Sequence, residues 1–395
     1  MSHHLTRRAF SKMLLSATVF MGSSMLLPET GFSGIINKSS GKTYKGPNVI
    51  IIRYGGGVRR RETIDMDHTY SPFMMNVLAP QATLYNNMEI SNFEGQKTDH
   101  AQGTLNILTG RYNAFKNIGD GILGNTLQPT HPTLFEYFRK AYDVGIHESL
   151  IINGENHPEN DSMNFGTSHD YGVEYKSELL SYHKYRAFVL KTKLYNGDIT
   201  KKEQDELDEI ISKSSNLIDP DMYPPSIQSF WQKWQRYYGD DRAIIPRGDS
   251  MSTEVALWAL RDLRPKLMLI NYEDPDHVHW GAKSHYKRGI MGIDQGIQQL
   301  VKAVETDPFY KDNTVFVIVP DCGRTDNLLM DIPYQHHFNT RSTREIFAMI
   351  SGAGIEKNQI IDHAVDQTSI AATVAKIMGF EAEMAEGSVL EEAFT

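Results

Sequence analysis

The residues from Asn48 to Arg53 read Asn-Val-Ile-Ile-Ile-Arg, an apolar, β-branched run that ends just before three glycines, Gly55 to Gly57. A short run of this kind without polar alternation is typical of a strand that is buried on both faces, as in the parallel sheet of an α/β protein. Ligands of such sheets bind beyond the carboxyl ends of the strands. The glycines therefore mark the edge at which a functional site is expected.

Later segments repeat the pattern, with helices between the strands. We predict further strands at 150–152, 266–272, 314–319 and 346–350, and helices at 71–78, 104–109, 133–142, 252–263, 286–304 and 367–378. Strands that alternate with helices form βαβ units. The predicted fold class is α/β, with a mainly parallel central sheet and helices on both faces.

The alternation stops between Gly154 and Asp249, where the chain is polar and charged. We interpret residues 155–249 as a helical insert or cap within a domain that spans 45–395. Its last helix is aromatic, with Phe230, Trp231, Trp234, Tyr237 and Tyr238. These rings either fasten the insert to the body, the simpler interpretation, or stack against a substrate.

The N-terminus has the features of an export signal. Arg7 and Arg8 precede Phe10, Lys12 and a mildly apolar stretch, Met13 to Leu27. Paired arginines before a weak apolar region are typical of a twin-arginine signal, although a disordered basic start would look similar. The stretch is too short and too mild for a stable transmembrane anchor. We expect residues 1–35 to be a signal and linker, read by the twin-arginine machinery, and the protein to be periplasmic.

Composition excludes some functions. The 395 residues carry a formal net charge of −9, which disfavours a nucleic-acid binder. Their one cysteine, Cys322, rules out an intramolecular disulfide. The hydrophobic share of 40% is enough for the core of one large domain with an insert.

Three polar clusters lie near the ends of predicted strands. They are Glu273 to His279, Asp321 to Arg324, and the pair His336 and His337. Carboxylates and imidazoles are the usual ligands of a catalytic divalent metal such as Zn, Mn or Fe. Because the strands end at one edge of the sheet, the clusters predict a metal site there.

The order of the motifs resembles the alkaline phosphatase superfamily, in its sulfatase and phosphodiesterase branch, over essentially the whole mature chain. The resembling segments are Asn48–Arg59, Ser71–Asn87, Ile107–Tyr112, Tyr272–Gly281, Asn313–Gly323 and Val365–Gly379. Active members hold two metals about 4 Å apart, which clamp the attacking and leaving oxygens at phosphorus or sulfur.

The resemblance assigns the first metal to Asp276, His279 and either His337 or His336. Because the spacing before His279 is one residue shorter than in the family, Asp274 is an alternative to Asp276.

The second metal set departs from the family. Asp321 matches, but Cys322 stands where a histidine is expected and Gly55 stands where an aspartate is expected. His100, ten residues before Gly110, stands where a hydroxyl or thiol nucleophile is expected. We predict one tightly bound divalent ion, with Zn favoured over Mn, Fe or Ca.

Several roles stay open in this second set. Cys322 is a thiolate ligand or a buried filler. His100 is a nitrogen nucleophile, a ligand or inert, and Asp99 is close enough in sequence to replace it. Arg324 and Arg53 either grip an ester oxygen or form internal salt bridges.

The leading functional hypothesis is an exported metal-dependent hydrolase of phosphate or sulfate esters, acting on a small-molecule, glycan or lipid ester. One alternative is a catalytically impaired member that binds a metal or ligand in the cell envelope. A second is a phosphoryl-group transferase that uses the aromatic insert as its acceptor platform. The oligomeric state is open.

Overall fold

The computed structural model describes residues 41–91, 98–117, 127–154, 163–213, 223–240, 245–279, 281–327, 329, 331–337 and 340–394. Its central strand, β1 (Asn48–Tyr54), pairs in parallel with β7 (Leu267–Asn271) on one side and with β8 (Thr314–Pro320) on the other. Every residue of these three strands is buried. The apolar runs therefore form the middle of a sheet that is covered on both faces, as predicted.

Within the described residues the sheet has nine strands in the order β10-β2-β9-β8-β1-β7-β5-β6, with β11 paired to β2 off that path. The other strands are β2 (Ala82–Glu89), β5 (Ser149–Ile152), β6 (Glu178–Leu180), β9 (Glu345–Gly352), β10 (Gln359–Ile361) and β11 (Val365–Asp366). Strand β9 is antiparallel to both of its neighbours, and the other pairs are parallel. The predicted mainly parallel α/β fold is confirmed.

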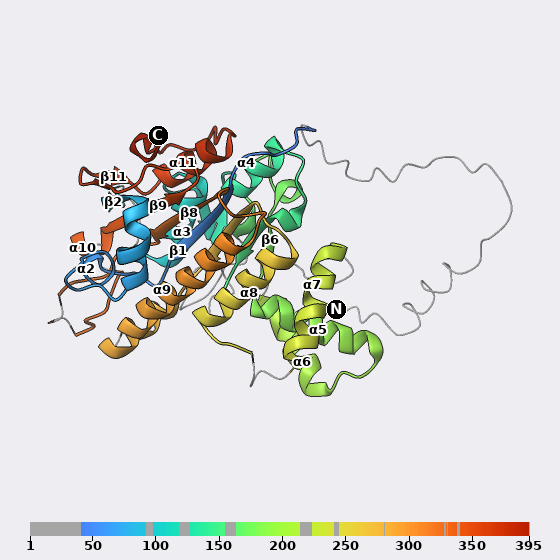
Figure 1. Cartoon of the computed structure of the whole chain (residues 1–395). Helices are drawn as coiled ribbons and strands as arrows, with labels where there is room; N and C mark the ends of the chain where they lie inside the picture. The colour runs from blue at the N-terminus through green and yellow to red at the C-terminus, as the bar shows by residue number, and fades with distance from the viewer. Residues whose placement is uncertain are drawn as a thin grey trace. The chain divides into compact units, whose positions relative to one another are not determined.

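Helices cover both faces of the sheet. Alternate residues of β1 point to opposite faces, so Ile50 and Ile52 lie in one core and Val49 and Ile51 in the other. The first core includes α8 (Asp249–Asp262) and α9 (Lys283–Thr306), and the second includes α3 (His100–Thr109), α4 (Leu134–Ala141) and α11 (Ser369–Met378). In Figure 1, α8 and α9 run together along one side of the sheet, while α4 and α11 lie along the other.

The helix ends follow the local sequence. Asp99 caps α3 by accepting a hydrogen bond from the backbone N–H of Gln102, and Gly110 ends the helix at a φ of 67°. A side chain would be strained at that left-handed φ, which explains the glycine. The segment predicted as a helix at 71–78 instead ends in a π-helical turn, Met74–Leu78.

Short elements complete the described chain. They are α2 (Arg60–Thr63), α10 (Arg341–Arg344), the hairpin of β3 (Phe115–Asn117) with β4 (Leu127–Pro129), and 3-10 turns at Ala79–Gln81, Ile146–Glu148, Val173–Tyr175, Asp274–Val278 and Glu391–Ala393.

The region between β5 and β7 is largely helical, with α5 (Tyr182–Asn196), α6 (Lys201–Lys213) and α7 (Pro225–Tyr238). The region also adds one strand to the sheet, because β6 pairs in parallel with β5. A strand of three residues is too short to show a periodic pattern. Phe230, Trp231 and Trp234 of α7 are buried in the core, so these rings fasten α7 to the body.

The Arg7-Arg8 segment lies outside the described residues. No helix in the described part of the chain has the length and apolar character needed to cross a membrane.

Candidate metal centre

The ends of β1, β7 and β8 bring polar side chains from distant parts of the sequence to one edge of the sheet. Asp276 lies in the 3-10 turn that follows β7, and His279 comes directly after that turn. Asp321 follows β8, and His100 begins α3. The loop before α10 adds His336 and His337.

Three imidazole nitrogens surround one oxygen of Asp276. The Nε2 atoms of His279, His100 and His336 lie 2.8, 2.9 and 3.2 Å from its Oδ1. Burial opposes ionisation of Asp276, but the charge of His100 and the hydrogen bonds from the histidines outweigh it and hold the pKa of this carboxyl well below its usual range. Asp276 is therefore a carboxylate at neutral pH.

The hydrogen bonds of His336 fix which of its ring nitrogens carries the proton. Its Nδ1 lies 2.7 Å from the carbonyl oxygen of Thr98, which can only accept, so Nδ1 carries the proton. Burial and the nearby charge of His100 lower the pKa of His336 to about 3, so the ring is neutral. Its Nε2 lone pair therefore faces the Asp276 carboxylate at 3.2 Å. Two acceptors at this distance repel each other unless cationic groups offset the repulsion, and His100 and Arg324 both contact the same oxygen of Asp276. A metal ion bound to both atoms would stabilise the arrangement further.

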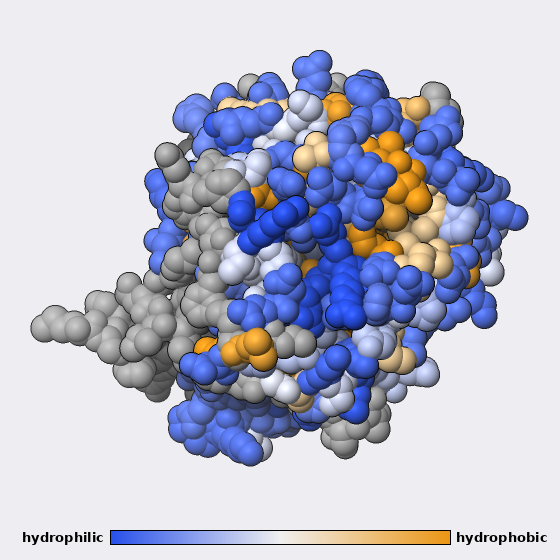
Figure 2. All heavy atoms as spheres, turned by 90° about the vertical axis from the view of Figure 1, so that its left-hand side faces the viewer, coloured by the Kyte–Doolittle hydropathy of each residue, from blue (hydrophilic) through white to orange (hydrophobic). Residues whose placement is uncertain are grey.

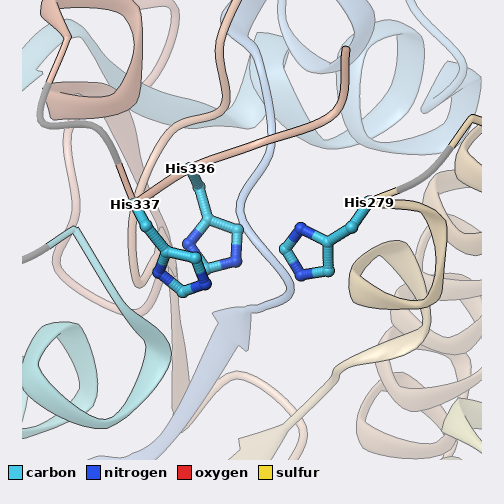
Figure 3. Close-up of side chains that lie close together, drawn as sticks. All are labelled: His279, His336 and His337. Atoms are coloured by element: carbon cyan, nitrogen blue, oxygen red, sulfur yellow. The ribbon is translucent and has the colours of Figure 1, made fainter. Parts of the chain in front are cut away.

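His279, His336 and His337 present donor atoms close enough together to share one ion. Figure 3 shows the rings of His336 and His279 opposite each other across a gap, with His337 beside His336. Burial and the charge of His100 lower the pKa of His337 to about 4, which keeps its nitrogens available as ligands. We call Asp276, His279, His336 and His337 the Asp276 cluster. It contains both alternatives, His336 and His337, for the third predicted ligand.

The second group, here the Asp321 cluster, consists of Arg53, His100, Asp321 and Cys322. Asp321 Oδ2 accepts hydrogen bonds from Arg53 Nη1 at 2.9 Å and His100 Nδ1 at 2.7 Å. Its Oδ1 accepts from the backbone N–H groups of Cys322 and Gly57. Burial raises the pKa of Asp321, but His100 and Arg53 more than compensate and lower it below its usual range.

His100 bridges the two clusters. Its Nδ1 faces Asp321 and its Nε2 faces Asp276, so both ring nitrogens lie against carboxylates. Burial would lower the pKa of His100, but the two carboxylates raise it well above its usual value. A doubly protonated ring has no lone pair, so this arrangement does not present His100 as a nucleophile.

Cys322 is fully buried beside these groups. Burial and the charge of Asp321 raise the pKa of its thiol to about 12. The thiol is therefore buried and protonated here, and its position beside His100 and Asp321 would also allow it to ligate an ion, so both predicted roles stay open.

Three other predicted residues lie elsewhere. Arg324 is fully buried and donates to the carbonyls of Gly56, Gly57 and Tyr334, with Asp276 a further contact at 3.3 Å. The guanidinium N–H groups of Arg324 therefore bind protein groups. Arg324 stabilises these loops and does not present its guanidinium to an ester.

Asp274 and Asp99 are not among the ligand groups formed by the described residues. Asp274 Oδ1 accepts the N–H of Asp249, and its own N–H donates to Asp249 Oδ2. Asp99 caps α3. In the sequence, Asp274 lies close to Asp276 and Asp99 is next to His100, so each could have replaced its neighbour as a site residue. In the structure the backbone turns direct Asp274 and Asp99 to other partners.

Thr98, two residues before His100, and Glu273, which begins one of the three predicted polar clusters, also contribute to the site. The Thr98 hydroxyl donates to the His336 carbonyl, so Thr98 holds this histidine from both ends. Glu273 Oε1 accepts from Arg53 Nη2 at 3.1 Å. No sequence signal marks Thr98, whereas Glu273 directly follows a strand and stands beside a ligand motif.

Comparison with known proteins identifies the fold. No protein-family profile and no curated protein sequence matches the chain. Among solved structures, BT1596, described as a 2-O GAG sulfatase, aligns with a TM-score of 0.54 and 14% identity over 88% of this chain and 73% of its own. A protein in the alkaline phosphatase superfamily from Vibrio parahaemolyticus aligns with a TM-score of 0.53 and 13% identity over 89% and 71%. The chain has the alkaline phosphatase–sulfatase fold.

A further structure with this fold, Ps i-CgsB in complex with k-i-k-neocarrahexaose, aligns with a TM-score of 0.51 and 12% identity over 87% of this chain and 75% of its own. The fold places its ligands beyond the carboxyl ends of the strands. The Asp276 and Asp321 clusters occupy that edge here.

Proposed function

We propose that this chain is an exported, metal-dependent hydrolase of phosphate or sulfate esters. The observation that carries the proposal is the neutral His336, whose Nε2 lone pair faces the Asp276 carboxylate with two further histidines beside it. A divalent cation held there by Asp276, His279, His336 and His337 would withdraw charge from the ester oxygens.

The donor set favours some metals over others. Three imidazoles and one carboxylate suit Zn, with Mn and Fe as alternatives. Calcium prefers ligand sets made of oxygen, so a nitrogen-rich set disfavours it. The single carboxylate in contact with the histidines therefore supports Zn as the resident ion.

The attacking oxygen comes from water in this proposal. His100 stands at the position that carries the nucleophile in related enzymes, and both of its nitrogens face carboxylates. With no side-chain hydroxyl in that position, water supplies the oxygen that bonds to phosphorus or sulfur, and the alcohol leaves with a proton. Asp321 and Asp276 keep His100 oriented between them.

A polar cavity of about 730 Å³ is placed to receive the alcohol portion of the ester. Its walls include Arg59, Arg60, Arg61, Lys283, Asp326 and Glu345. Lys283 lies four residues after His279, and Asp326 two after Arg324, which contacts Asp276. These two wall residues come from the same stretches of chain as His279 and Arg324, although no residue of the Asp276 cluster itself lines the cavity. Figure 2 shows strongly hydrophilic side chains around a hollow on the side of the molecule that carries α2.

The cavity walls favour a glycan ester over a lipid ester. Ile64 is the only aliphatic side chain among the described residues that line it, and the others offer charged or polar groups of both kinds. Such walls suit sugar hydroxyls, which both donate and accept. Two proteins with this fold are described as a GAG sulfatase and as a complex with neocarrahexaose, which supports the same substrate class.

A non-catalytic metal- or ligand-binding role is the second candidate. It is favoured by Gly55 and His100, which replace the aspartate and nucleophile that the resemblance leads us to expect. It predicts bound metal without turnover.

Elemental analysis followed by an ester panel separates these functions. We expect bound Zn, and hydrolysis of at least one of 4-nitrophenyl phosphate, bis(4-nitrophenyl) phosphate, 4-nitrophenyl sulfate and sulfated oligosaccharides, with activity lost on chelation and restored by Zn. Metal without hydrolysis of any panel member would support the binding role. Protein that contains no metal and takes up none would contradict both.

Export has a separate test. Replacing Arg7 and Arg8 with lysine should keep the protein soluble in the cytoplasm, because the twin-arginine machinery reads the pair. Unchanged delivery to the periplasm would contradict this part of the proposal.

A further inference from the structure

Arg53 lies beneath the candidate metal centre and is fully buried. Its guanidinium contacts Asp321 Oδ2 at 2.9 Å and Glu273 Oε1 at 3.1 Å, and donates to the hydroxyl of Thr104 and the carbonyl of Tyr272. A guanidinium keeps its positive charge inside proteins. Two carboxylates at the ligand edge of the sheet are therefore already neutralised by a cation that belongs to the chain.

Gly55 makes this arrangement possible. A Cβ atom at Gly55 would lie 1.8 Å from the Tyr272 carbonyl oxygen and 3.0 Å from Arg53 Nη2. Any side chain at position 55 would thus collide with the strand beside it and with the guanidinium. The aspartate that the resemblance leads us to expect here has no room, and the space beside it is filled by Arg53.

Asp321 has no oxygen left for an ion in this arrangement. Its Oδ2 accepts from Arg53 and His100, and its Oδ1 accepts from the N–H groups of Cys322 and Gly57. A divalent ion beside Asp321 would have to displace the guanidinium or lie next to it. Like charges in a buried site repel strongly, so an ion next to the guanidinium is unfavourable.

We propose that the guanidinium of Arg53 takes the place of a second divalent cation and makes this a one-ion centre with a built-in arginine cation. This inference rests on the proposed metal centre for the first ion. It gives Arg53 a positioning and charge-balancing role, because the buried guanidinium meets carboxylates of the protein rather than substrate. Arg53 thus explains why Asp321 persists where the rest of the second metal set has changed.

The test is the metal content of the full chain, measured by elemental analysis after incubation with excess Zn and dialysis. The wild type should hold one equivalent. Arg53→Gln removes the charge and leaves Asp321, Glu273, His100 and Cys322 near one another, so it should hold two. Arg53→Lys keeps the charge and should hold one.

Arg139 offers a matched control, since it is also buried and donates to backbone carbonyls in another part of the fold. Arg139→Gln should hold one equivalent, which separates the site-specific effect from the loss of a buried arginine in general. Circular dichroism on each variant reports whether it is folded.

The outcomes distinguish this inference from the proposed function. Two equivalents in the wild type, or one in a folded Arg53→Gln protein, would overturn the role of Arg53 and leave the first metal site standing. No equivalent in the wild type would overturn the proposed metal centre.

If Arg53→Gln does not fold, Asp321→Asn decides. We expect this variant to keep its one ion, because Asp321 binds Arg53 rather than metal. Loss of the ion in folded Asp321→Asn protein would overturn the inference.

Discussion

The Asp276 and Asp321 clusters share one edge of the sheet but balance their charge in opposite ways. In the Asp276 cluster, the neutral His336 turns its lone pair toward a carboxylate that His100 and Arg324 also contact, and the proposed function adds a cation from outside. In the Asp321 cluster, the chain supplies the cation itself through Arg53. The difference indicates two ways of balancing buried carboxylates at one sheet edge, by a side-chain cation or, as proposed, by a bound ion.

The largest expected effect comes from removing a ligand of the Asp276 cluster. Asp276→Asn should weaken Zn binding roughly a hundred- to a thousand-fold, since a binding free energy of about 12 kcal/mol shared by four ligands gives about 3 kcal/mol for each. Activity should disappear with the metal. Isothermal titration with Zn measures the change.

His363 provides the control for this experiment, because it pairs with Glu392 at 3.0 Å on the surface. His363→Ala should bind Zn like the wild type. Adding His336→Ala to Asp276→Asn should cause little further loss, because the first substitution already disables the shared site. Full and separate losses for the two substitutions would contradict a common ion.

A second prediction tests the packing that holds Arg53. Gly55→Ala should lower the free energy of unfolding by about 2–4 kcal/mol, because its Cβ would meet the Tyr272 carbonyl. Chemical denaturation measures this.

Gly292 in α9 is the matched control, since a Cβ there would meet no atom within 4 Å. Gly292→Ala should be neutral or stabilising by up to about 1 kcal/mol. Equal stability of the two alanine variants would show that position 55 has room for a side chain, against the account of the Asp321 cluster.

His100 connects the clusters, so its removal should have an intermediate effect. His100→Ala should weaken Zn binding roughly 10- to 100-fold, as expected for a residue that orients a ligand without holding the ion alone. Metal content and activity that both remain at the wild-type level would show that His100 is inert.

The smallest effect is expected in the polar cavity lined by Arg61 and Lys283. Once a glycan ester is identified, Arg61→Gln and Lys283→Gln should each raise KM about 3- to 10-fold with kcat unchanged, which corresponds to roughly 0.7–1.4 kcal/mol. Metal content should not change.

Lys201→Gln is the control, because Lys201 lies on α6 and pairs with Asp205 on the surface. A fall in kcat at unchanged KM in the cavity variants would place Arg61 or Lys283 in the chemistry instead of in substrate binding.

The strands and the main helices were predictable because their signals are local. The β1 run and the glycine stop at Gly110 each report a backbone preference within a few residues, whereas the start of α3 was predicted at 104 and lies at His100. Strand β6 was missed because three residues are too few to show a pattern of alternating hydrophobic and polar side chains. Its place at the sheet edge depends on pairing with β5, which lies elsewhere in the sequence.

The candidate site was predictable only as a set of residues. Motif order placed Asp276, His279 and either His337 or His336 near one strand edge, and the structure brings Asp276, His279 and His336 into contact. The sequence did not predict the partner of Arg53. An arginine at this position could either form a salt bridge to Asp321 or bind an ester oxygen, and the sequence is the same in both cases. Only the direction of the guanidinium, toward Asp321 and Glu273, distinguishes the two.

The central claim is that one ion belongs to the Asp276 cluster and none to the Asp321 cluster. The most direct measurement is an anomalous difference map at the zinc edge, from crystals of the full mature chain grown with excess Zn. The account predicts a single strong peak in contact with Asp276, His279, His336 and His337, and ordinary protein density for the Arg53 guanidinium against Asp321. A peak of equal strength between Asp321 and Cys322, or no peak beside Asp276, would contradict it.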